Sequence, residues 1–180
     1  ETHTLYTADV TRTLPINGTY SELQKKVYDA VYEAQEAGIA AVRPGAKYRD
    51  FHDAAQRVLA AKLLEWGLVE GPVGRVLELG LQRRWTLHGT GHMLGMDVHD
   101  CAVARTETYV DGVLEPGMVL TVEPGLYFQA DDLTVPEEYR GVGVRIEDDI
   151  LVTEDGNRNL SAALPRRADE VEAWMAALKG

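Results

Sequence analysis

The chain has 180 residues, of which 45% are hydrophobic and 26% are charged, and its formal net charge at pH 7 is −11. These values suit one hydrophobic core or a large part of one, and the excess of acids disfavours nucleic acid as a partner because Lys and Arg drive phosphate binding. The apolar runs are all far shorter than the roughly 20 residues that span a bilayer, so we expect no membrane partner.

The first part of the chain is predicted to form one strand and two long helices. The strand is expected at residues 5–14, and Ser21 then caps a long helix whose apolar residues recur at helical spacing. A turn at residues 43–45 leads to a second helix of the same kind, at about residues 48–66. His52 falls off the apolar stripe of this helix, and we expect it to be solvated or bonded locally.

The second part of the chain is predicted to be mostly strands. A loop at residues 67–74 and a short helix at residues 75–81 come first, and strand patterns then dominate from residue 85 to residue 165. A last helix is expected at about residues 169–178. Because helices come first and strands later, we predict an α+β fold, with helices packed on one face of a curved, mainly antiparallel sheet.

A histidine cluster is the strongest sign of chemistry. The segment HGTGHMLGMDVHD, residues 88–100, holds three of the five histidines, and histidine is the commonest side chain for binding a metal or moving a proton near neutral pH. Three carboxylates lie in apolar segments elsewhere: Asp9, Glu123 and Glu147. A single buried Glu is more often paired in a salt bridge, but the combination favours a metal site, and oxygen ligands with one imidazole suit manganese, cobalt, zinc or iron.

Four segments resemble one known family. They are YTADVTRTLPINGTYS, HGTGHMLGMDVHD, VLTVEPGLYF and GVGVRIEDDILVTEDGNRNLS. Together they are similar to the catalytic domain of the aminopeptidase P and prolidase group of pita-bread metallopeptidases, most of all to bacterial Xaa-Pro aminopeptidases. The resemblance implies a partial pita-bread fold. It also implies that residues 1–180 are a carboxy-terminal portion of the catalytic domain, without the amino-terminal domain and the start of the catalytic domain.

The resemblance also implies a metal centre. Matching the motifs residue by residue makes Asp9, His92, Glu123 and Glu147 four of the family's five ligands. The fifth is an Asp that precedes the first motif in the family and has no counterpart here. The implied cofactors are two divalent ions, with Mn²⁺ the first expectation and Co²⁺ or Zn²⁺ as alternatives.

Further residues receive catalytic roles from the same resemblance. Glu123 would also take up the proton of the attacking water, and His99 would stabilise the tetrahedral intermediate or guide a proton to the leaving nitrogen. His88 would contact the residue after the scissile bond. Arg145 has the same strand parity as Glu147, so its guanidinium is expected to orient a carboxylate near the metals. Tyr127 would either bond near the site or fill the core.

The implied reaction is hydrolysis of the amino-terminal Xaa-Pro bond by a metal-bridging hydroxide, with peptides that carry proline at the second position as substrates. Two alternatives stay open: an Xaa-Pro dipeptidase (prolidase), and a non-catalytic pita-bread protein that binds peptides. We expect little activity from the isolated 180 residues, a partner in the missing remainder of the enzyme, and a homo-oligomer. The single cysteine, Cys101, fits a reducing compartment, so we expect a cytoplasmic protein.

Overall fold

The structure is a computed structural model that describes residues 3–100 and 109–178. Cys101 therefore lies outside the described residues. The helices, in chain order, are α1 (Glu22–Ala41), α2 (Tyr48–Glu65), α3 (Val73–Leu79), the 3-10 helices η1 (Leu81–Arg84) and η3 (Glu137–Tyr139), and α4 (Ala168–Leu178). Within the described part of the chain, no helix is both long and apolar enough to cross a membrane.

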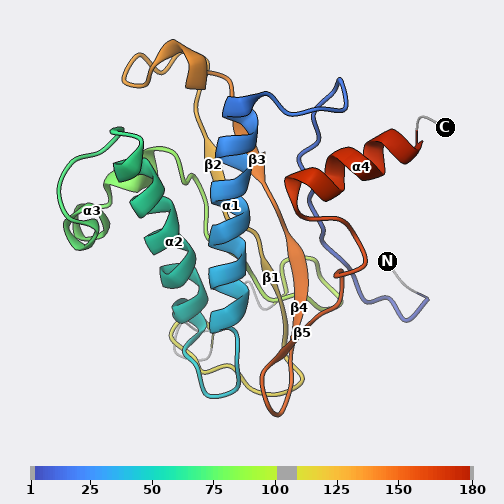
Figure 1. Ribbon diagram of the computed structural model, residues 1–180. Helices are drawn as coiled ribbons and strands as arrows, with labels where there is room; N and C mark the ends of the chain where they lie inside the picture. Colours follow the sequence, from blue (N-terminus) through green and yellow to red (C-terminus); the bar gives the residue numbers. More distant parts are fainter. Residues whose placement is uncertain (1–2, 101–108, 179–180) are drawn as a thin grey trace.

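Among the described residues, the strands form two small antiparallel sheets. One sheet has the order β1-β4-β5, built from β1 (Val119–Val122), β4 (Asp148–Val152) and β5 (Asn157–Asn159). The other pairs β2 (Gly125–Tyr127) with β3 (Gly143–Arg145). Because β2 follows β1 after two residues, and β4 follows β3 after two residues, the two ladders lie end to end (Figure 1). Glu123 and Glu147 occupy the two breaks between them.

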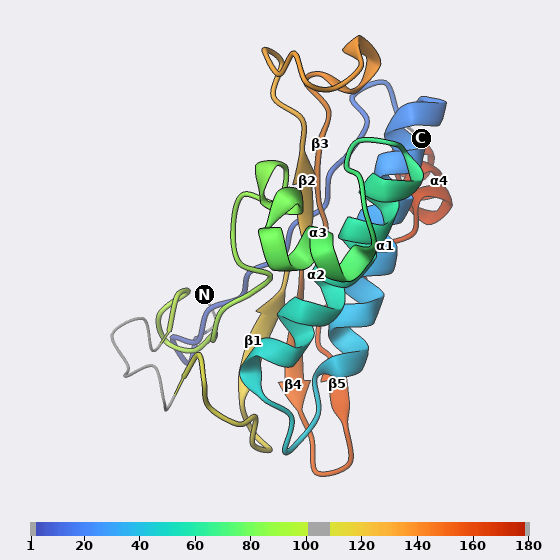
Figure 2. The same ribbon diagram turned by 90° about the vertical axis from the view of Figure 1, so that its left-hand side faces the viewer.

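The long helices α1 and α2 run side by side along one face of these strands (Figures 1 and 2). The main core lies between the two layers and includes Val31, Leu59 and Leu126, each fully buried. A second cluster around Phe51 and Ile150 fills the other end of the same interface. The prediction of helices packed on one face of antiparallel sheets is therefore confirmed.

Most helix boundaries agree with the sequence analysis. Ser21 caps α1 as predicted: its hydroxyl accepts from the N–H of Gln24, whose side chain accepts from the Ser21 N–H in return. The second helix begins at Tyr48 as expected, and α3 and α4 each begin one or two residues earlier than predicted. Pro72 is the N-cap of α3, and its carbonyl accepts from the N–H groups of Arg75 and Val76.

The prediction of a strand at residues 5–14 is wrong. The segment is extended but forms only an isolated bridge, between Arg12 and Ile146. Its remaining polar groups bind partners outside any ladder: the N–H of Thr7 donates to the carbonyl of Gly95, and the N–H of Asp9 to the carboxylate of Asp149. The segment thus has a mixture of main-chain and side-chain partners in place of a regular ladder.

The prediction of strands from residue 85 onward is also wrong up to residue 100. This segment runs antiparallel beside β1, because the N–H groups of Leu94, Thr121 and Glu123 bind the carbonyls of Val119, His92 and Thr90. In a regular antiparallel ladder the N–H of His92 would donate to the carbonyl of Thr121, but here it donates to the Thr121 hydroxyl. The side-chain acceptor displaces the carbonyl that a regular ladder needs, so the segment is irregular and only isolated bridges form.

Candidate metal centre

The four predicted ligands converge on one place. Nε2 of His92 lies 3.6 Å from a carboxylate oxygen of Asp9 and 3.5 Å from one of Glu123. His92, Glu123 and Glu147 each offer a ligand atom within 4.8 Å of the others. These residues are far apart in sequence, and the fold brings them together where the two sheets meet.

The imidazole of His92 is oriented for metal binding. Its Nδ1 lies 3.0 Å from the carbonyl of Met93, and a carbonyl can only accept, so Nδ1 carries the proton. In the neutral ring this leaves a lone pair on Nε2, the atom that faces Asp9 and Glu123. A histidine that donates from one nitrogen to a carbonyl and presents the other to a cluster of acids is the usual arrangement of a metal ligand.

The two glutamates are buried acids. Glu147 is 1% exposed and Glu123 is 8% exposed. Burial raises the pKa of both carboxyl groups, and the negative charge of Asp9 raises the two pKa values further. Three carboxyl groups around one imidazole form a set of oxygen and nitrogen donors that suits divalent cations, whose charge would compensate for the burial of the acids. The donor set therefore fits the predicted ions.

Arg145 contacts this cluster, as strand parity predicted. Its Nη1 lies 3.6 Å from the second carboxylate oxygen of Glu123. The same alternation turns Asp148 to the opposite face, where it meets Gln35 of α1. The guanidinium thus holds one oxygen of Glu123 while the other faces His92.

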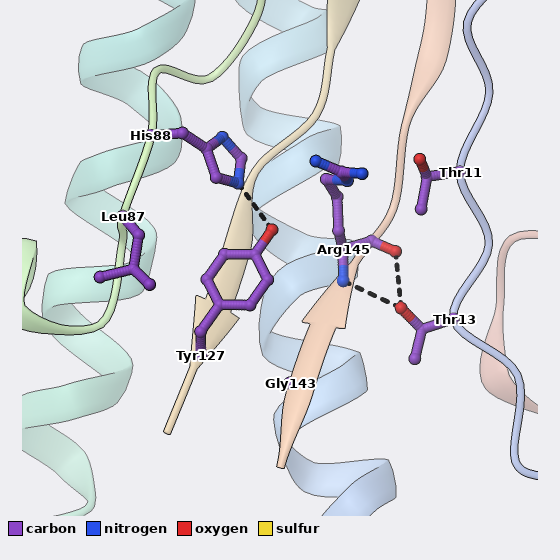
Figure 3. Close-up of a pocket in the computed structure, with 7 residues that line it drawn as sticks. All are labelled: Thr11, Thr13, Leu87, His88, Tyr127, Gly143 and Arg145. Atoms are coloured by element: carbon purple, nitrogen blue, oxygen red, sulfur yellow. Dashed lines mark hydrogen bonds between the residues drawn. The ribbon is translucent and has the colours of Figure 1, made fainter. Parts of the chain in front are cut away.

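An open cavity of about 440 Å³ adjoins the carboxylates. Figure 3 shows its lining: Thr11, Thr13, Leu87, His88, Tyr127, Gly143 and Arg145. The Tyr127 hydroxyl and Nε2 of His88 are 2.6 Å apart, and Nδ1 of His88 lies 2.6 Å from the carbonyl of Gly89. Nδ1 therefore donates to the carbonyl and Nε2 accepts from Tyr127, so both nitrogens of His88 are occupied within the protein.

The remaining histidine of the cluster, His99, lies at the mouth of the site. Its ring meets that of His92 edge-on, with 4.3 Å between centroids. His99 is exposed, and it also forms a possible ligand group with Asp9 and His92. The sequence predicted a place on the substrate side for His99, and in the structure one of its ring nitrogens lies within 4.8 Å of ligand atoms of Asp9 and His92.

Two threonines that the sequence analysis missed complete the cluster. The Thr11 hydroxyl donates to Glu147 at 2.5 Å, and the Thr121 hydroxyl lies 3.4 Å from Glu123. One signal was available for Thr11: it is two residues after Asp9 in an extended segment, so both side chains point to the same side.

Comparison with known proteins agrees with this geometry. A sequence model of metallopeptidase family M24 matches residues 2–154. The chain belongs to this family. The M24 chain is 90% identical over its whole length to Xaa-Pro aminopeptidase 1 of Streptomyces coelicolor. It is 42% identical, over 97% of its length, to Xaa-Pro aminopeptidase of Escherichia coli.

Solved structures extend the likeness to the fold. The M24 chain matches Pseudomonas aeruginosa aminopeptidase PepP with a TM-score of 0.92 and 43% identity, over 97% of this chain and 39% of that one. It matches an Escherichia coli aminopeptidase P structure with the inhibitor Pro-Leu with a TM-score of 0.90. The pita-bread fold and the resemblance to aminopeptidase P are thereby confirmed. The chain spans 37% of the length of its Streptomyces coelicolor relative.

Proposed function

We propose that this M24 chain contributes most of a two-metal centre that hydrolyses the amino-terminal Xaa-Pro bond of peptides. The observation that carries the proposal is the position of Nε2 of His92, which lies 3.6 Å from a carboxylate oxygen of Asp9 and 3.5 Å from one of Glu123. Curated relatives at 90% and 42% identity are Xaa-Pro aminopeptidases, which supports the same reaction.

Asp9, His92, Glu123 and Glu147 would hold the ions, for which Mn²⁺ is our first choice and Co²⁺ or Zn²⁺ the alternatives. When bound, such ions lower the pKa of a water molecule so that it can attack a carbonyl near neutral pH. Glu123 would accept the proton of that water. Its pKa is raised by burial, and Arg145 fixes one of its oxygens, so the proton acceptor is held in one orientation.

Histidines would handle the substrate. His99 is exposed beside Asp9 and His92, where it would stabilise the tetrahedral intermediate or guide a proton to the leaving nitrogen. His88 lines the adjoining cavity with its ring fixed by Tyr127, so it would contact the residue after the scissile bond. The side chain of Leu87 and the ring of Tyr127 give this cavity an apolar wall against which a proline ring would pack.

The expected substrates are therefore peptides with proline at the second position. A prolidase that prefers Xaa-Pro dipeptides and a peptide-binding protein without catalysis are the two alternatives. The relatives' names favour an aminopeptidase over both. We place the protein in the cytoplasm, as a homo-oligomer.

The test uses the natural gene product that contains these residues. After chelation, Mn²⁺ is added back, and metal content is measured together with hydrolysis of a Gly-Pro-type tripeptide and of an Xaa-Pro dipeptide. We expect about two ions per chain and cleavage of the tripeptide. His92→Ala should lose metal and activity, while His3→Ala, at an exposed histidine, should keep both.

Faster cleavage of the dipeptide would select the prolidase alternative. If the metal-loaded protein cleaves neither peptide, the alternative of a peptide-binding protein without catalysis would be favoured. Normal metal content in His92→Ala would contradict the proposed centre itself.

A further inference from the structure

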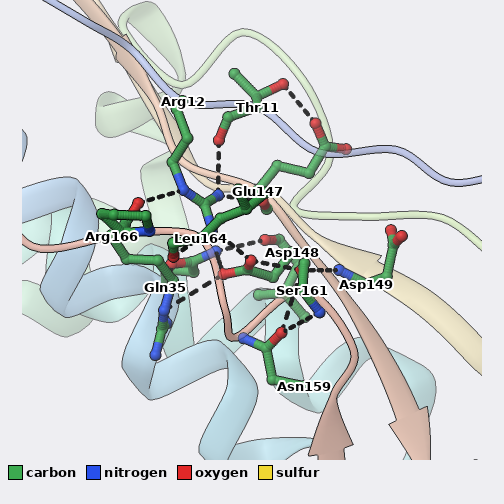
Figure 4. A network of polar contacts seen from close by, with 12 residues as sticks. Thr11, Arg12, Gln35, Glu147, Asp148, Asp149, Asn159, Ser161, Leu164 and Arg166 are labelled. Atoms are coloured by element: carbon green, nitrogen blue, oxygen red, sulfur yellow. Dashed lines mark hydrogen bonds and ion pairs between the residues drawn. The ribbon is translucent and has the colours of Figure 1, made fainter. Parts of the chain in front are cut away.

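Three consecutive acids, residues 147–149, make three different kinds of contact (Figure 4). Glu147 faces the proposed ions. Asp149 accepts the N–H of Asp9, at 3.3 Å to one carboxylate oxygen and 3.4 Å to the other. Asp148 faces the helices instead and is fully buried. Asp148 belongs to neither group of possible metal ligands, so its burial requires another explanation.

The carboxylate of Asp148 is surrounded by donors from three separate segments: the amino-terminal segment, α1, and the connection between β5 and α4. Oδ1 accepts from Nη2 of Arg12 at 2.7 Å and from the hydroxyl of Ser161 at 2.6 Å. Oδ2 accepts from Nε2 of Gln35 at 2.9 Å and lies 3.5 Å from Nε of Arg166. A buried ion pair of this kind adds little stability compared with an apolar replacement of similar volume. The desolvation cost of burying these charged groups suggests that they serve to fix the positions of neighbouring residues.

Arg12 uses its other N–H groups on the backbone of the site. Its side chain is only 6% exposed. Nη1 donates to the carbonyl of Glu147 at 2.6 Å and to that of Thr11 at 2.9 Å, and Nε donates to the carbonyl of Pro165 at 2.7 Å. The N–H of Glu147 also donates to the carbonyl of Thr11. Both main-chain polar groups of Glu147 are therefore tied to residues 11 and 12.

The second glutamate is tied to the same carboxylate by another route. Nε2 of Gln35, besides its bond to Asp148, lies 3.2 Å from the carbonyl of Val122. Val122 directly precedes Glu123. One buried carboxylate thus connects the backbone at Glu147 with the backbone beside Glu123.

We propose that Arg12 and Asp148 are positioning residues that fix the spacing of the Glu147 and Glu123 carboxylates and so set the affinity for the ions. The inference rests on the proposed metal centre. Neither residue would touch metal or substrate. Partners that orient ligands in this way typically change metal affinity by about 10- to 100-fold when they are replaced.

The test is Arg12→Lys in the natural gene product, titrated with Co²⁺ after chelation and followed by visible absorption. Lysine keeps the positive charge but loses the planar fork that reaches several acceptors at once. We expect Co²⁺ to bind about 10- to 100-fold more weakly, and the spectrum of the saturated variant to differ from that of the wild type.

Two controls separate positioning from stability. Arg75→Lys changes an exposed arginine paired with Glu78 and should leave the titration unchanged. Leu63→Ala removes a core side chain of α2 and should lower the free energy of unfolding while the spectrum of the folded protein stays the same.

A folded Arg12→Lys protein with wild-type Co²⁺ affinity and spectrum would overturn the inference. If Arg12→Lys does not fold, Ser161→Ala takes its place, because this hydroxyl binds the same oxygen of Asp148 as Arg12 does. A changed spectrum would support the inference, and an unchanged one would overturn it. Failure of the wild type to bind Co²⁺ would instead count against the proposed function.

Discussion

The hydroxyls of Tyr48 and Tyr109 lie 3.3 Å apart and hold the backbone on both sides of His92. Tyr48 donates to the carbonyl of Gly91 at 2.9 Å, and the N–H of Met93 donates to the Tyr109 oxygen at 3.0 Å. Because Tyr48 gives its one proton to Gly91, the contact between the hydroxyls is donated by Tyr109. The proposed ligand is thus fixed by two side chains that never reach the metal site.

This arrangement makes Tyr48→Phe informative. The substitution leaves the Gly91 carbonyl without its donor and removes an acceptor from Tyr109, so we expect about 1–2 kcal/mol of destabilisation. The measurement is urea unfolding of the metal-free protein. Tyr6→Phe, at an exposed tyrosine, should change the free energy of unfolding by less than about 0.5 kcal/mol. Equal stability of the two variants would show that the tyrosine pair does not hold the segment.

Gly91 offers a steric test of the same segment. A Cβ at this position would lie 2.0 Å from the carbonyl oxygen of Thr121, which no rotation can relieve because both atoms belong to rigid backbone. We expect Gly91→Ala to destabilise the fold by about 1–3 kcal/mol or more and to weaken metal binding by displacing His92. Gly74→Ala is the matched control, since nothing lies within 4 Å of its Cβ and alanine favours the helix α3. Thermal unfolding with and without Mn²⁺ measures both effects.

The sequence predicted those parts of the site that follow from local periodicity. Strand alternation places Arg145 on the same side as Glu147 and turns Asp148 the other way, whereas the partner that Arg145 meets, Glu123, lies between the neighbouring strands β1 and β2. The cap at Ser21 was also predicted from the sequence, because a Ser directly before an apolar periodic run is a typical helix start. These features depend on neighbours that are close in the chain, which is why a pattern can show them.

The features that the sequence did not predict depend on contacts between distant segments. Thr121 takes the N–H of His92 and thereby makes residues 85–100 irregular, although their composition resembles that of strands. The contacts of Arg12 with carbonyls at residues 147 and 165 are equally nonlocal. No spacing rule links such positions, because only the tertiary fold brings them together.

Asp132 anchors the loop between β2 and β3 and gives a prediction about pH. Its carboxylate accepts from Arg84 at 2.9 Å and from the indole N–H of Trp85 at 3.0 Å. The Arg84 contact, with help from Thr134, holds the pKa of Asp132 well below its usual value. A depressed pKa means that the stabilisation is complete above the unfolded-state pKa of about 3.9 and is lost as pH falls toward the folded-state pKa.

The measurement is urea unfolding of wild type and Asp132→Asn from about pH 6 down to about pH 3. We expect the wild type to be the more stable protein at the upper end and its advantage to shrink below about pH 4. Asp131→Asn, at the exposed neighbouring acid, should have the same free energy of unfolding as the wild type at every pH. A difference between wild type and Asp132→Asn that does not vary with pH would assign the effect to the lost hydrogen-bond acceptor and exclude the carboxylate charge as its cause.

Glu147→Gln should separate stability from metal binding. Glu147 is buried, and its pKa is raised by burial and by the negative charges of Glu123 and Asp9. Glutamine has the same shape, and its amide oxygen can still accept from Thr11. Removing one of several like charges that lie a few ångströms apart should stabilise the metal-free protein by about 1 kcal/mol after screening.

The same substitution should abolish the response to metal. In the wild type, Mn²⁺ at about 100 times its dissociation constant should add about 2.7 kcal/mol to the free energy of unfolding for each ion bound. After chelation, Glu147→Gln should have a higher free energy of unfolding than the wild type, and Mn²⁺ should raise this value little. Glu138→Gln, at an exposed acid, should have the same free energy of unfolding as the wild type both without and with Mn²⁺. A metal-free Glu147→Gln protein that is less stable than the wild type would mean that the carboxylate is needed by the fold itself. Glu147→Gln should therefore be the more stable protein without Mn²⁺, and the wild type the more stable protein with it. This reversal is expected if the fold holds the acids together against their mutual repulsion and bound cations relieve that repulsion.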